Sequence, residues 1–298
     1  MKFITTLVWV CTFLFSAFSA KGQSPFAEAD RWMNEGLFEQ AAVAYEYVLY
    51  QNQTDTIVFI EGIFKKLNCL KKQQNYAAIP SLLHRISNFS LNDSVQFYYY
   101  YERSLAYYLS GNFKEAAQSL LPVFNINLPN PDSHRAAIML YAFTLNELTQ
   151  WRDCRTMLKD YINSQNTSSQ SSKDSLLHMI DASYADDEIP KLKSLKKAHV
   201  LSLLFPGLGQ AYNGDYAKGL LSLSLTGASA AYIAYNIINT TYITAGTAGV
   251  YLFLYFYYGG VNQHLKLVPQ KNAVKKSKYN NHLKNTLVEL NNRLAQLP

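Results

Sequence analysis

The residues that could carry chemistry in this 298-residue chain stand apart from one another. The histidines of the mature chain occur singly, at His84, His134, His178, His199, His264 and His282. No Ser/His/Asp set, no metal-binding spacing of His or Cys, and no glycine-rich loop followed by a Lys-Ser/Thr pair is present in the sequence. We therefore expect no enzymatic activity, no cofactor and no metal site.

One run of carboxylates and two cysteines need a separate interpretation. Asp186-Asp187-Glu188 could suggest a cation site, but no His or regular loop spacing accompanies the run. It fits better as a solvated face or as a helix N-terminus next to Pro190. Cys69 and Cys154 are expected to be small core residues, too far apart to form a disulfide.

The most specific motif lies between an apolar half-helix and a long apolar segment. Its residues are Pro206, Gly207, Gly209, Gln210, Tyr212, Asn213, Gly214, Tyr216, Lys218 and Gly219. Pro206 and the glycines must break the helix, and we expect Gln210 and Asn213 to cap the exposed backbone. The simpler interpretation is a re-entrant turn. The functional one is a contact of Lys218 and Tyr216 with a lipid head group or a partner helix.

Two charge-free segments of about 20 residues, 219–238 and 242–261, follow this motif. Each can cross about 30 Å of hydrocarbon as a helix, and only residues 239–241 separate them. Small residues recur at a spacing of four in both segments, which allows close helix contact. The pattern predicts an antiparallel transmembrane hairpin, through which a homo-oligomer could also form.

Residues 196–262 resemble known small membrane domains. Their Gly-x-Gly and aromatic pattern is similar to domains with two transmembrane helices, and Pro-Gly-x-Gly-Gln-x-Tyr-Asn resembles a bacterial membrane domain of unknown function. The His-Arg pair that usually follows the second glycine is replaced by Gln210-Ala211. The resemblance implies a membrane domain without a defined biochemical role.

The front half of the chain repeats itself with a period of about 38. Gly36-Leu37-Phe38 and Gly111-Asn112-Phe113 open the two clearest copies. Four aromatic anchors, separated by 38, 37 and 38 residues, are Phe38, Tyr76, Phe113 and Trp151. Three residues later stand Ala41, Ile79, Ala116 and Cys154, and seven residues later Tyr45, Leu83, Leu120 and Leu158. Small residues at the first set let two helices approach, with large apolar residues filling the space above.

This register resembles the tetratricopeptide repeat over residues 25–162, with a period longer than the usual 34 or so. The resemblance implies an all-α solenoid of about four helical hairpins, in which each unit packs on its neighbour and the concave face binds a partner. Four tyrosines in a row, Tyr98–Tyr101, cannot all face inward, so one or two should be exposed. The sequence does not identify the protein partner.

Charge and the N-terminus indicate export. Residues 1–22 combine Lys2, an apolar run and small residues, which predicts a signal peptide with the mature chain starting near Gln23. Residues 23–190 hold 13 Lys/Arg against 19 Asp/Glu, whereas residues 191–298 hold 12 against 2. Because the basic residues flank the apolar segments, we expect contact with membrane lipid and not with nucleic acid.

These patterns predict five parts: a signal peptide (1–22), repeats (23–162), a linker with a capping helix (163–190), a membrane domain with a half-helix and two transmembrane helices (191–265), and a basic tail, helical at its end (266–298). Lysines flank both outer ends of the hairpin and would favour a cytoplasmic location for both flanks. The signal places the repeats outside. Either the signal dominates, or residues 197–212 add a crossing. We favour the signal.

The expected function is therefore a membrane-anchored scaffold of the cell envelope. The repeat module would lie in the periplasm and bind a protein partner, while the hairpin fixes it in the inner membrane. The alternative is a subunit of an oligomeric membrane transport or secretion assembly.

Overall fold

The computed structural model describes residues 24–126, 130–165 and 170–296, and the described residues form helices without any strand. The all-α fold class is thus confirmed. The predicted signal peptide lies outside the described residues. The chain divides into two compact units, Met1–Leu148 and Thr149–Pro298.

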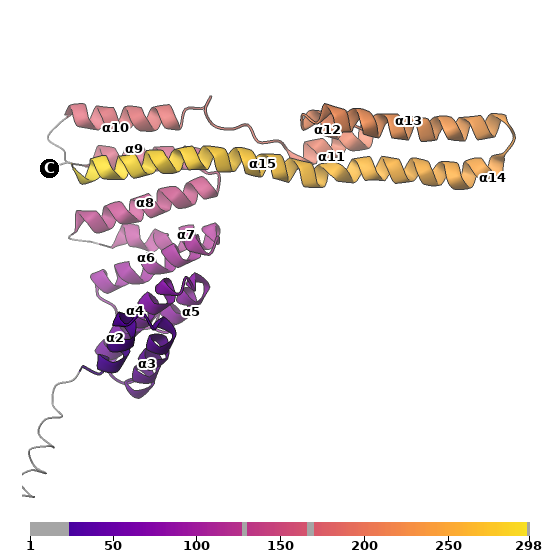
Figure 1. Ribbon diagram of the computed structural model, residues 1–298. Coiled ribbons are helices and arrows are strands. Elements are labelled where there is room, and N and C mark those ends of the chain that lie inside the picture. The colour runs from indigo at the N-terminus through magenta and orange to yellow at the C-terminus, as the bar shows by residue number, and fades with distance from the viewer. Residues whose placement is uncertain (1–23, 127–129, 166–169, 297–298) are drawn as a thin grey trace, which may run out of the picture. The chain divides into compact units, whose positions relative to one another are not determined.

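Unit 1 is a series of antiparallel helices in which each helix packs on the next in the chain. In chain order they are α2 (Ala27–Asn34), α3 (Phe38–Gln51), α4 (Thr56–Lys72), the 3-10 helix η1 (Tyr76–Ala78), α5 (Ile79–His84), α6 (Asp93–Leu109), α7 (Phe113–Leu120), the 3-10 helix η2 (Leu121–Asn125) and α8 (Pro131–Glu147) (Figure 1). Three buried clusters follow one another along the series. The core is therefore built between neighbouring helices.

The same left-handed turn precedes each of the four aromatic anchors. A helix begins at Phe38, Phe113 and Trp151, and η1 begins at Tyr76. Two residues before these anchors, φ is +78° at Gly36, +57° at Gln74, +78° at Gly111 and +63° at Thr149. Glycine adopts this conformation without strain, whereas Gln and Thr do so at a cost.

One backbone hydrogen bond closes three of these turns in the same way. The amide before the anchor donates to the carbonyl six residues before the anchor: Leu37 to Trp32 at 2.9 Å, Asn75 to Leu70 at 2.9 Å and Asn112 to Tyr107 at 2.8 Å. This bond satisfies a carbonyl that the preceding helix leaves free at its C-terminus.

The positions predicted to pack inside the helical pairs are buried. Ala41, Ala116 and Cys154 are fully buried, and Ile79 is 1% exposed. The larger residues four positions later, Tyr45, Leu83, Leu120 and Leu158, are at most 2% exposed. Both cysteines of this region, Cys69 and Cys154, are buried free thiols. Of the four consecutive tyrosines, Tyr98 is exposed and Tyr99 is buried.

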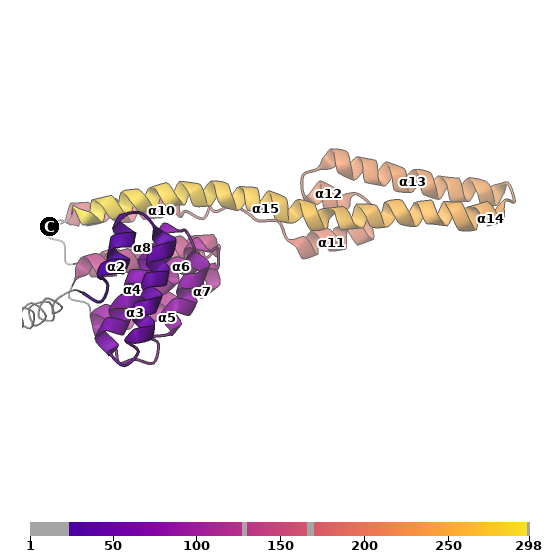
Figure 2. The ribbon, with the colours of Figure 1, turned by 60° about the horizontal axis from the view of Figure 1, so that its bottom comes forward.

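Unit 2 is organised around one long helix. It contains α9 (Trp151–Ser164), α10 (Gln170–Ser183), α11 (Leu195–Leu204), α12 (Leu208–Tyr212), α13 (Tyr216–Ile238), α14 (Tyr242–Thr244), a π-helical turn η3 (Ala245–Gly249) and α15 (Val250–Ala295). Helices α13 and α15 lie side by side in Figures 1 and 2, and α11 and α12 pack against the same part of α15.

The C-terminal part of α15 packs with α9 and α10. Trp151 Nε1 donates to Asn280 Oδ1 at 2.9 Å, and its ring meets Tyr279 edge-on at 5.1 Å. The Tyr279 hydroxyl donates to the Ser183 carbonyl at 2.9 Å. Leu283, Leu287 and Leu290 are fully buried on the same helix face. The predicted basic tail is therefore a continuous helix with a packed apolar stripe.

Two further boundaries differ from those expected. Helix α10 begins at Gln170, inside the segment expected to be a flexible linker, because its buried residues Leu176 and Ile180 pack it in place. Among the described helices, α13 alone has the length and apolar composition to cross a membrane. The second predicted span, residues 242–261, is divided between α14, η3 and the start of α15.

Candidate functional site

The glycine-rich motif forms a broken turn that leads from α11 through α12 into α13. Pro206 cannot continue α11, and Gly207 takes φ +92° at the start of α12. Gly214 takes φ +84° before α13 begins at Tyr216. The predicted helix break is therefore present at these residues.

Three of the glycines allow backbones to approach closely. A Cβ atom on Gly207 would lie 2.2 Å from the Gly219 carbonyl oxygen. A Cβ on Gly209 would lie 1.9 Å from Ser202 Oγ and 2.6 Å from the Ala198 carbonyl oxygen. Gly214 differs, because a Cβ there would meet no atom within 4 Å. Gly207, Gly209 and Gly219 thus serve packing, whereas Gly214 serves the backbone conformation.

Gln210 connects the turn to α15. Its side chain is fully buried, and Nε2 donates to the Gly260 carbonyl at 2.7 Å and to Gln263 Oε1 at 3.3 Å. We expected this side chain to cap the broken helix, but it bonds a carbonyl within α15. The free carbonyl of Leu203 near the end of α11 accepts from the Tyr257 hydroxyl at 2.8 Å. That contact joins residues 54 positions apart, so no local pattern could have shown it.

Asn213 also does not cap α11. Its Nδ2 donates to Asp215 Oδ2 at 3.2 Å. Lys271 Nζ lies 2.9 Å from Asp215 Oδ1 and donates to the Asn213 carbonyl at 3.2 Å. This ion pair fixes the start of α13 to α15 and occupies the only carboxylate of the motif.

Tyr212 lies between two lysines and the segment before α11. Lys193 Nζ is 4.7 Å and Lys197 Nζ is 5.5 Å from its ring centroid, both suited to cation–π attraction. The Ser194 amide donates to the Tyr212 hydroxyl at 3.2 Å. Tyr216 instead is 74% exposed, and Lys218 is also exposed. The structure therefore leaves Tyr216 and Lys218 accessible for an external contact.

The interior of this region has spare hydrogen-bonding capacity. Among the described residues, five buried side-chain atoms have no hydrogen-bond partner, and four of them belong to this region. These four are Ser202 Oγ, Gln210 Oε1, Asn213 Oδ1 and Ser222 Oγ. Buried polar groups are usually paired, so these four atoms are the available hydrogen-bonding positions of the region.

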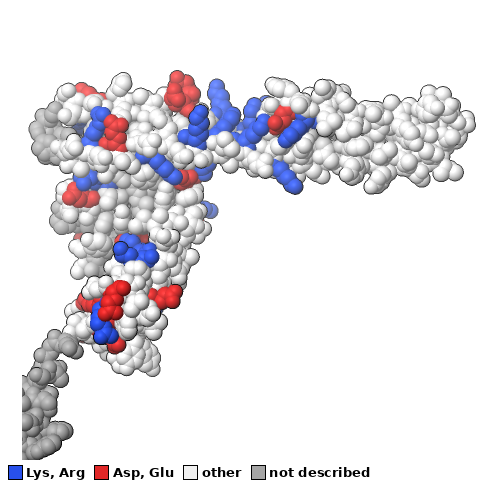
Figure 3. All heavy atoms as spheres, viewed as in Figure 1, with Lys and Arg blue, Asp and Glu red and all other residues white. Residues whose placement is uncertain are grey.

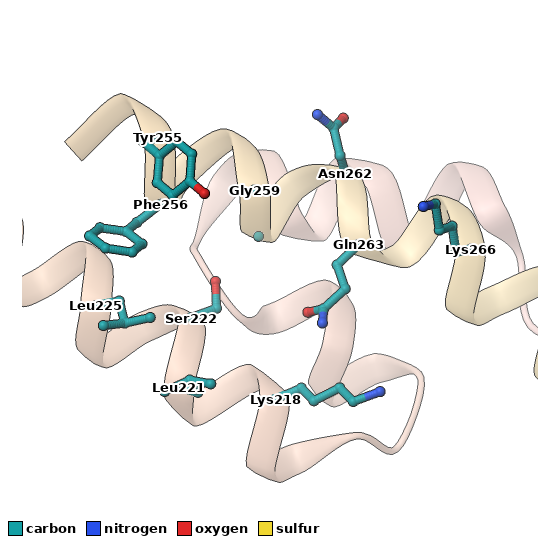
Figure 4. A pocket seen from close by; sticks show the side chains of 11 residues that line it. Lys218, Leu221, Ser222, Leu225, Tyr255, Phe256, Gly259, Asn262, Gln263 and Lys266 are labelled. Carbon is teal, nitrogen blue, oxygen red and sulfur yellow. The ribbon is translucent and has the colours of Figure 1, made fainter. Parts of the chain in front are cut away.

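A pocket of about 490 Å³ opens between α13 and α15. Figure 4 shows Lys218 and Lys266 at one end and Leu225 and Phe256 at the other. Ser222 lies between the two ends, with its hydroxyl directed toward α15. The pocket thus has a cationic end and an apolar end.

A second pocket, of about 670 Å³, lies on α2 and α3 in unit 1. Its lining includes Trp32, Val43 and Tyr47, together with Glu28 and Glu39. Val43 is 71% and Tyr47 is 62% exposed. Exposed aliphatic and aromatic side chains in a groove are typical of a surface that binds another protein.

The two buried cysteines, Cys69 and Cys154, have thiols whose pKa is raised. Burial raises the pKa of the Cys154 thiol to about 12, although the Tyr184 hydroxyl lies 3.3 Å away. Burial also raises the pKa of Cys69. A thiol that stays protonated is a poor nucleophile. Among the described residues, no group of three His, Cys, Asp or Glu side chains is arranged to hold a metal ion.

All three residues of the acidic run Asp186–Glu188 are exposed. Asp186 forms an ion pair with Arg152 at 3.0 Å, and both side chains are more than two-thirds exposed. This contact agrees with the expected solvated face.

Comparison with models of protein families, with curated proteins and with solved structures finds no match to this chain.

Proposed function

We propose that the chain is a membrane-anchored scaffold of the cell envelope, without catalytic activity. The predicted repeats of residues 23–162 supply the helical module that binds a protein partner. The region from α11 to the middle of α15 supplies the membrane anchor, with α13 and the start of α15 as a transmembrane hairpin.

The reversed polarity of α13 is the observation that carries this proposal. Its buried residues are all small or polar: Gly219, Ser222, Thr226, Ser229 and Asn236. Its outward face carries leucine and isoleucine, with Leu220 66% and Ile238 79% exposed. In water this arrangement would be costly, whereas in lipid the apolar face is solvated and small residues let the helices pack.

Three of the four buried polar side chains of α13, those of Thr226, Ser229 and Asn236, are satisfied within their own helix. Thr226 Oγ1 donates to the Ser222 carbonyl at 2.8 Å, Ser229 Oγ to the Thr226 carbonyl at 2.8 Å, and Asn236 Nδ2 to the Tyr232 carbonyl at 2.9 Å. Internal satisfaction of this kind is what a hydrocarbon environment requires.

The distribution of charge supports the same assignment. Figure 3 shows Lys and Arg gathered near α11, α12 and the middle of α15, and no charge toward the end formed by α13 and α14. Lysines beside an uncharged stretch of that length suit the level of lipid head groups.

The length of α11 supports one of the two topologies left open by the sequence. Its ten residues span about 15 Å, half of the roughly 30 Å hydrocarbon thickness. It is too short to add a crossing, so we place both flanks of the hairpin on one side. With an export signal, that side is the periplasm, and the turn at residues 239–241 faces the cytoplasm.

The anchoring is tested by fractionation. The full chain should remain in the membrane pellet after an alkaline carbonate wash and be released by detergent. Arginine at Ala228 and Ala231 together, both exposed near the middle of α13, should reduce the pelleted fraction, because each charge at the centre of a transmembrane helix costs about 2.5–3.5 kcal/mol. Arginine at exposed Val43 and Tyr47 is the matched control and should leave the pelleted fraction unchanged. Release of the wild-type chain by lysis alone would overturn the proposal.

The scaffold role is tested at the α2–α3 groove. A photo-reactive amino acid at Tyr47 should give one discrete cross-linked species in native membranes. The same amino acid at exposed Lys114, on α7, is the control and should not give that species. Identical cross-linking at both positions would contradict a specific partner at the groove.

A further inference from the structure

The pocket between α13 and α15 has the layout of an amphiphile. Along α13, Lys218, Ser222 and Leu225 follow one another at helical spacing on the face that lines it. We infer that this pocket binds one anionic phospholipid, with its phosphate at Lys218 and Lys266 and an acyl chain along Leu225 and Phe256. The inference rests on the proposed membrane insertion.

The cationic end has two lysines free for an external anion. Neither Lys218 nor Lys266 forms an ion pair with a described residue, whereas neighbouring Lys271 is paired with Asp215 at 2.9 Å. No Asp or Glu lines the pocket. Two lysines without an ion pair, one on each helix, therefore line the same end of the pocket (Figure 4). A phosphate diester supplies the complementary charge and acceptor oxygens.

The middle of the pocket offers an unused hydrogen-bond donor. Ser222 is 8% exposed, and its Oγ has no partner among the described residues. It lies one helical turn from Lys218, about 6 Å along the axis. An ester carbonyl of a phospholipid lies at a similar distance below the phosphate and would accept from this hydroxyl.

The far end accommodates hydrocarbon. Leu225 lies about 10 Å along the axis from Lys218, and Phe256 and Tyr255 face it from α15. Gly259 keeps this side open, because a Cβ atom there would meet nothing within 4 Å. The order of cation, hydroxyl and apolar side chains matches the order of phosphate, ester and chain.

An inorganic phosphate would use only the lysines, and a partner helix would not need two cations at one end of an apolar pocket. The lipid alone uses all three parts. The quaternary ammonium group of phosphatidylcholine would bring its own positive charge toward Lys218 and Lys266, so the site should favour phosphatidylglycerol over phosphatidylcholine.

The test is native mass spectrometry of the full chain in detergent, titrated with phosphatidylglycerol, phosphatidylcholine or inorganic phosphate. We expect one tightly bound phosphatidylglycerol. Replacing Lys218 and Lys266 by Gln should weaken it roughly thirtyfold, from about fivefold for each lysine. The control with the same charge change, Lys196→Gln with Lys278→Gln, uses two exposed lysines outside the pocket and should bind as wild type.

The variant Gly259→Leu distinguishes binding of a phospholipid from binding of phosphate alone. The new side chain fills the apolar end of the pocket and leaves both lysines in place. It should weaken phosphatidylglycerol at least tenfold. Equal binding of phosphatidylcholine, competition by inorganic phosphate at equal concentration, or unchanged binding in both pocket variants would each overturn the inference. Carbonate fractionation of the same variants distinguishes the two proposals: a chain that stays in the pellet but binds no lipid refutes the pocket and leaves the anchor intact.

Discussion

Alanine at Gly207 gives a sharp test of the close packing between α12 and α13. The new Cβ would lie 2.2 Å from the Gly219 carbonyl oxygen and 2.9 Å from its carbon, so helix backbone must move. Overpacking of this kind costs about 1–3 kcal/mol. The left-handed conformation, with φ +92°, adds about 1–2 kcal/mol. Together, Gly207→Ala should lower the stability of unit 2 by about 2–5 kcal/mol.

Two other glycines separate the cost of the steric clash from the cost of the left-handed conformation. Gly214→Ala keeps the strain of φ +84° but meets no atom within 4 Å, so it should cost only about 1–2 kcal/mol. Gly227→Ala lies inside α13 with open space around it and should stabilise the helix by about 0.5–1 kcal/mol. The expected order of stability is Gly227→Ala, wild type, Gly214→Ala, Gly207→Ala.

The assay follows a cysteine placed at Ser229, which is 4% exposed on the buried face of α13. In a chain whose native cysteines are serine, heating in mild detergent with a thiol-reactive dye reports when that face opens. One kcal/mol shifts the midpoint by about 2–4 °C in a unit of this size. A midpoint for Gly207→Ala equal to that of Gly214→Ala would show that the backbones do not approach as described.

Three further predictions concern the left-handed turns of unit 1 and two contacts within unit 2. Gln74→Gly should raise the unfolding midpoint by relieving φ +57°, and Gly111→Ala should lower the free energy of unfolding by about 1–2 kcal/mol; a lower midpoint for Gln74→Gly or a higher one for Gly111→Ala in thermal circular dichroism would refute the shared turn. Hydrogen bonds from Lys159, and then from Arg155, lower the pKa of Asp181, so the stability it contributes is present above the unfolded pKa of 3.8 and is lost as pH falls through the folded value. Asp181→Asn should therefore destabilise at neutral pH and converge with wild type in acid; a constant difference across pH would contradict this. Asn280→Ala removes the Oδ1 acceptor of the buried Trp151 Nε1 and should lower the free energy of unfolding by about 1–3 kcal/mol. Chemical unfolding followed by tryptophan fluorescence measures this change, and an unchanged midpoint would disprove the contact.

The repeat register could be predicted because its signals are local. Ala41 and Ala116 stand three residues after an aromatic, and both are fully buried. The left-handed turns at Gln74 and Thr149 could not be predicted from residue type, because neither Gln nor Thr favours that conformation. Their positions, two residues before Tyr76 and Trp151, were the available signal.

In the proposed membrane region, most contacts join residues far apart in the sequence and could not be predicted from local signals. The helix break at Pro206 and Gly207 follows from residue types, but the partner of Gln210 is a carbonyl 50 residues away in α15. The packed stripe of the C-terminal helix is visible as Tyr279, Leu283, Leu287 and Leu290 at helical spacing, whereas the sequence prediction was a basic tail that is helical at its end. Long-range pairing is set by the fold and leaves no local trace in the sequence.

The side of the membrane on which each part lies tests the central claim most directly. Single cysteines at exposed Lys114, in unit 1, and exposed Thr240, in the turn after α13, are placed in a chain lacking Cys11, Cys69 and Cys154. With an impermeant maleimide on intact spheroplasts, Lys114→Cys should be labelled and Thr240→Cys should react only after permeabilisation. Labelling of both in intact spheroplasts would show that the hairpin does not cross, and the reverse pattern would place the helical module in the cytoplasm.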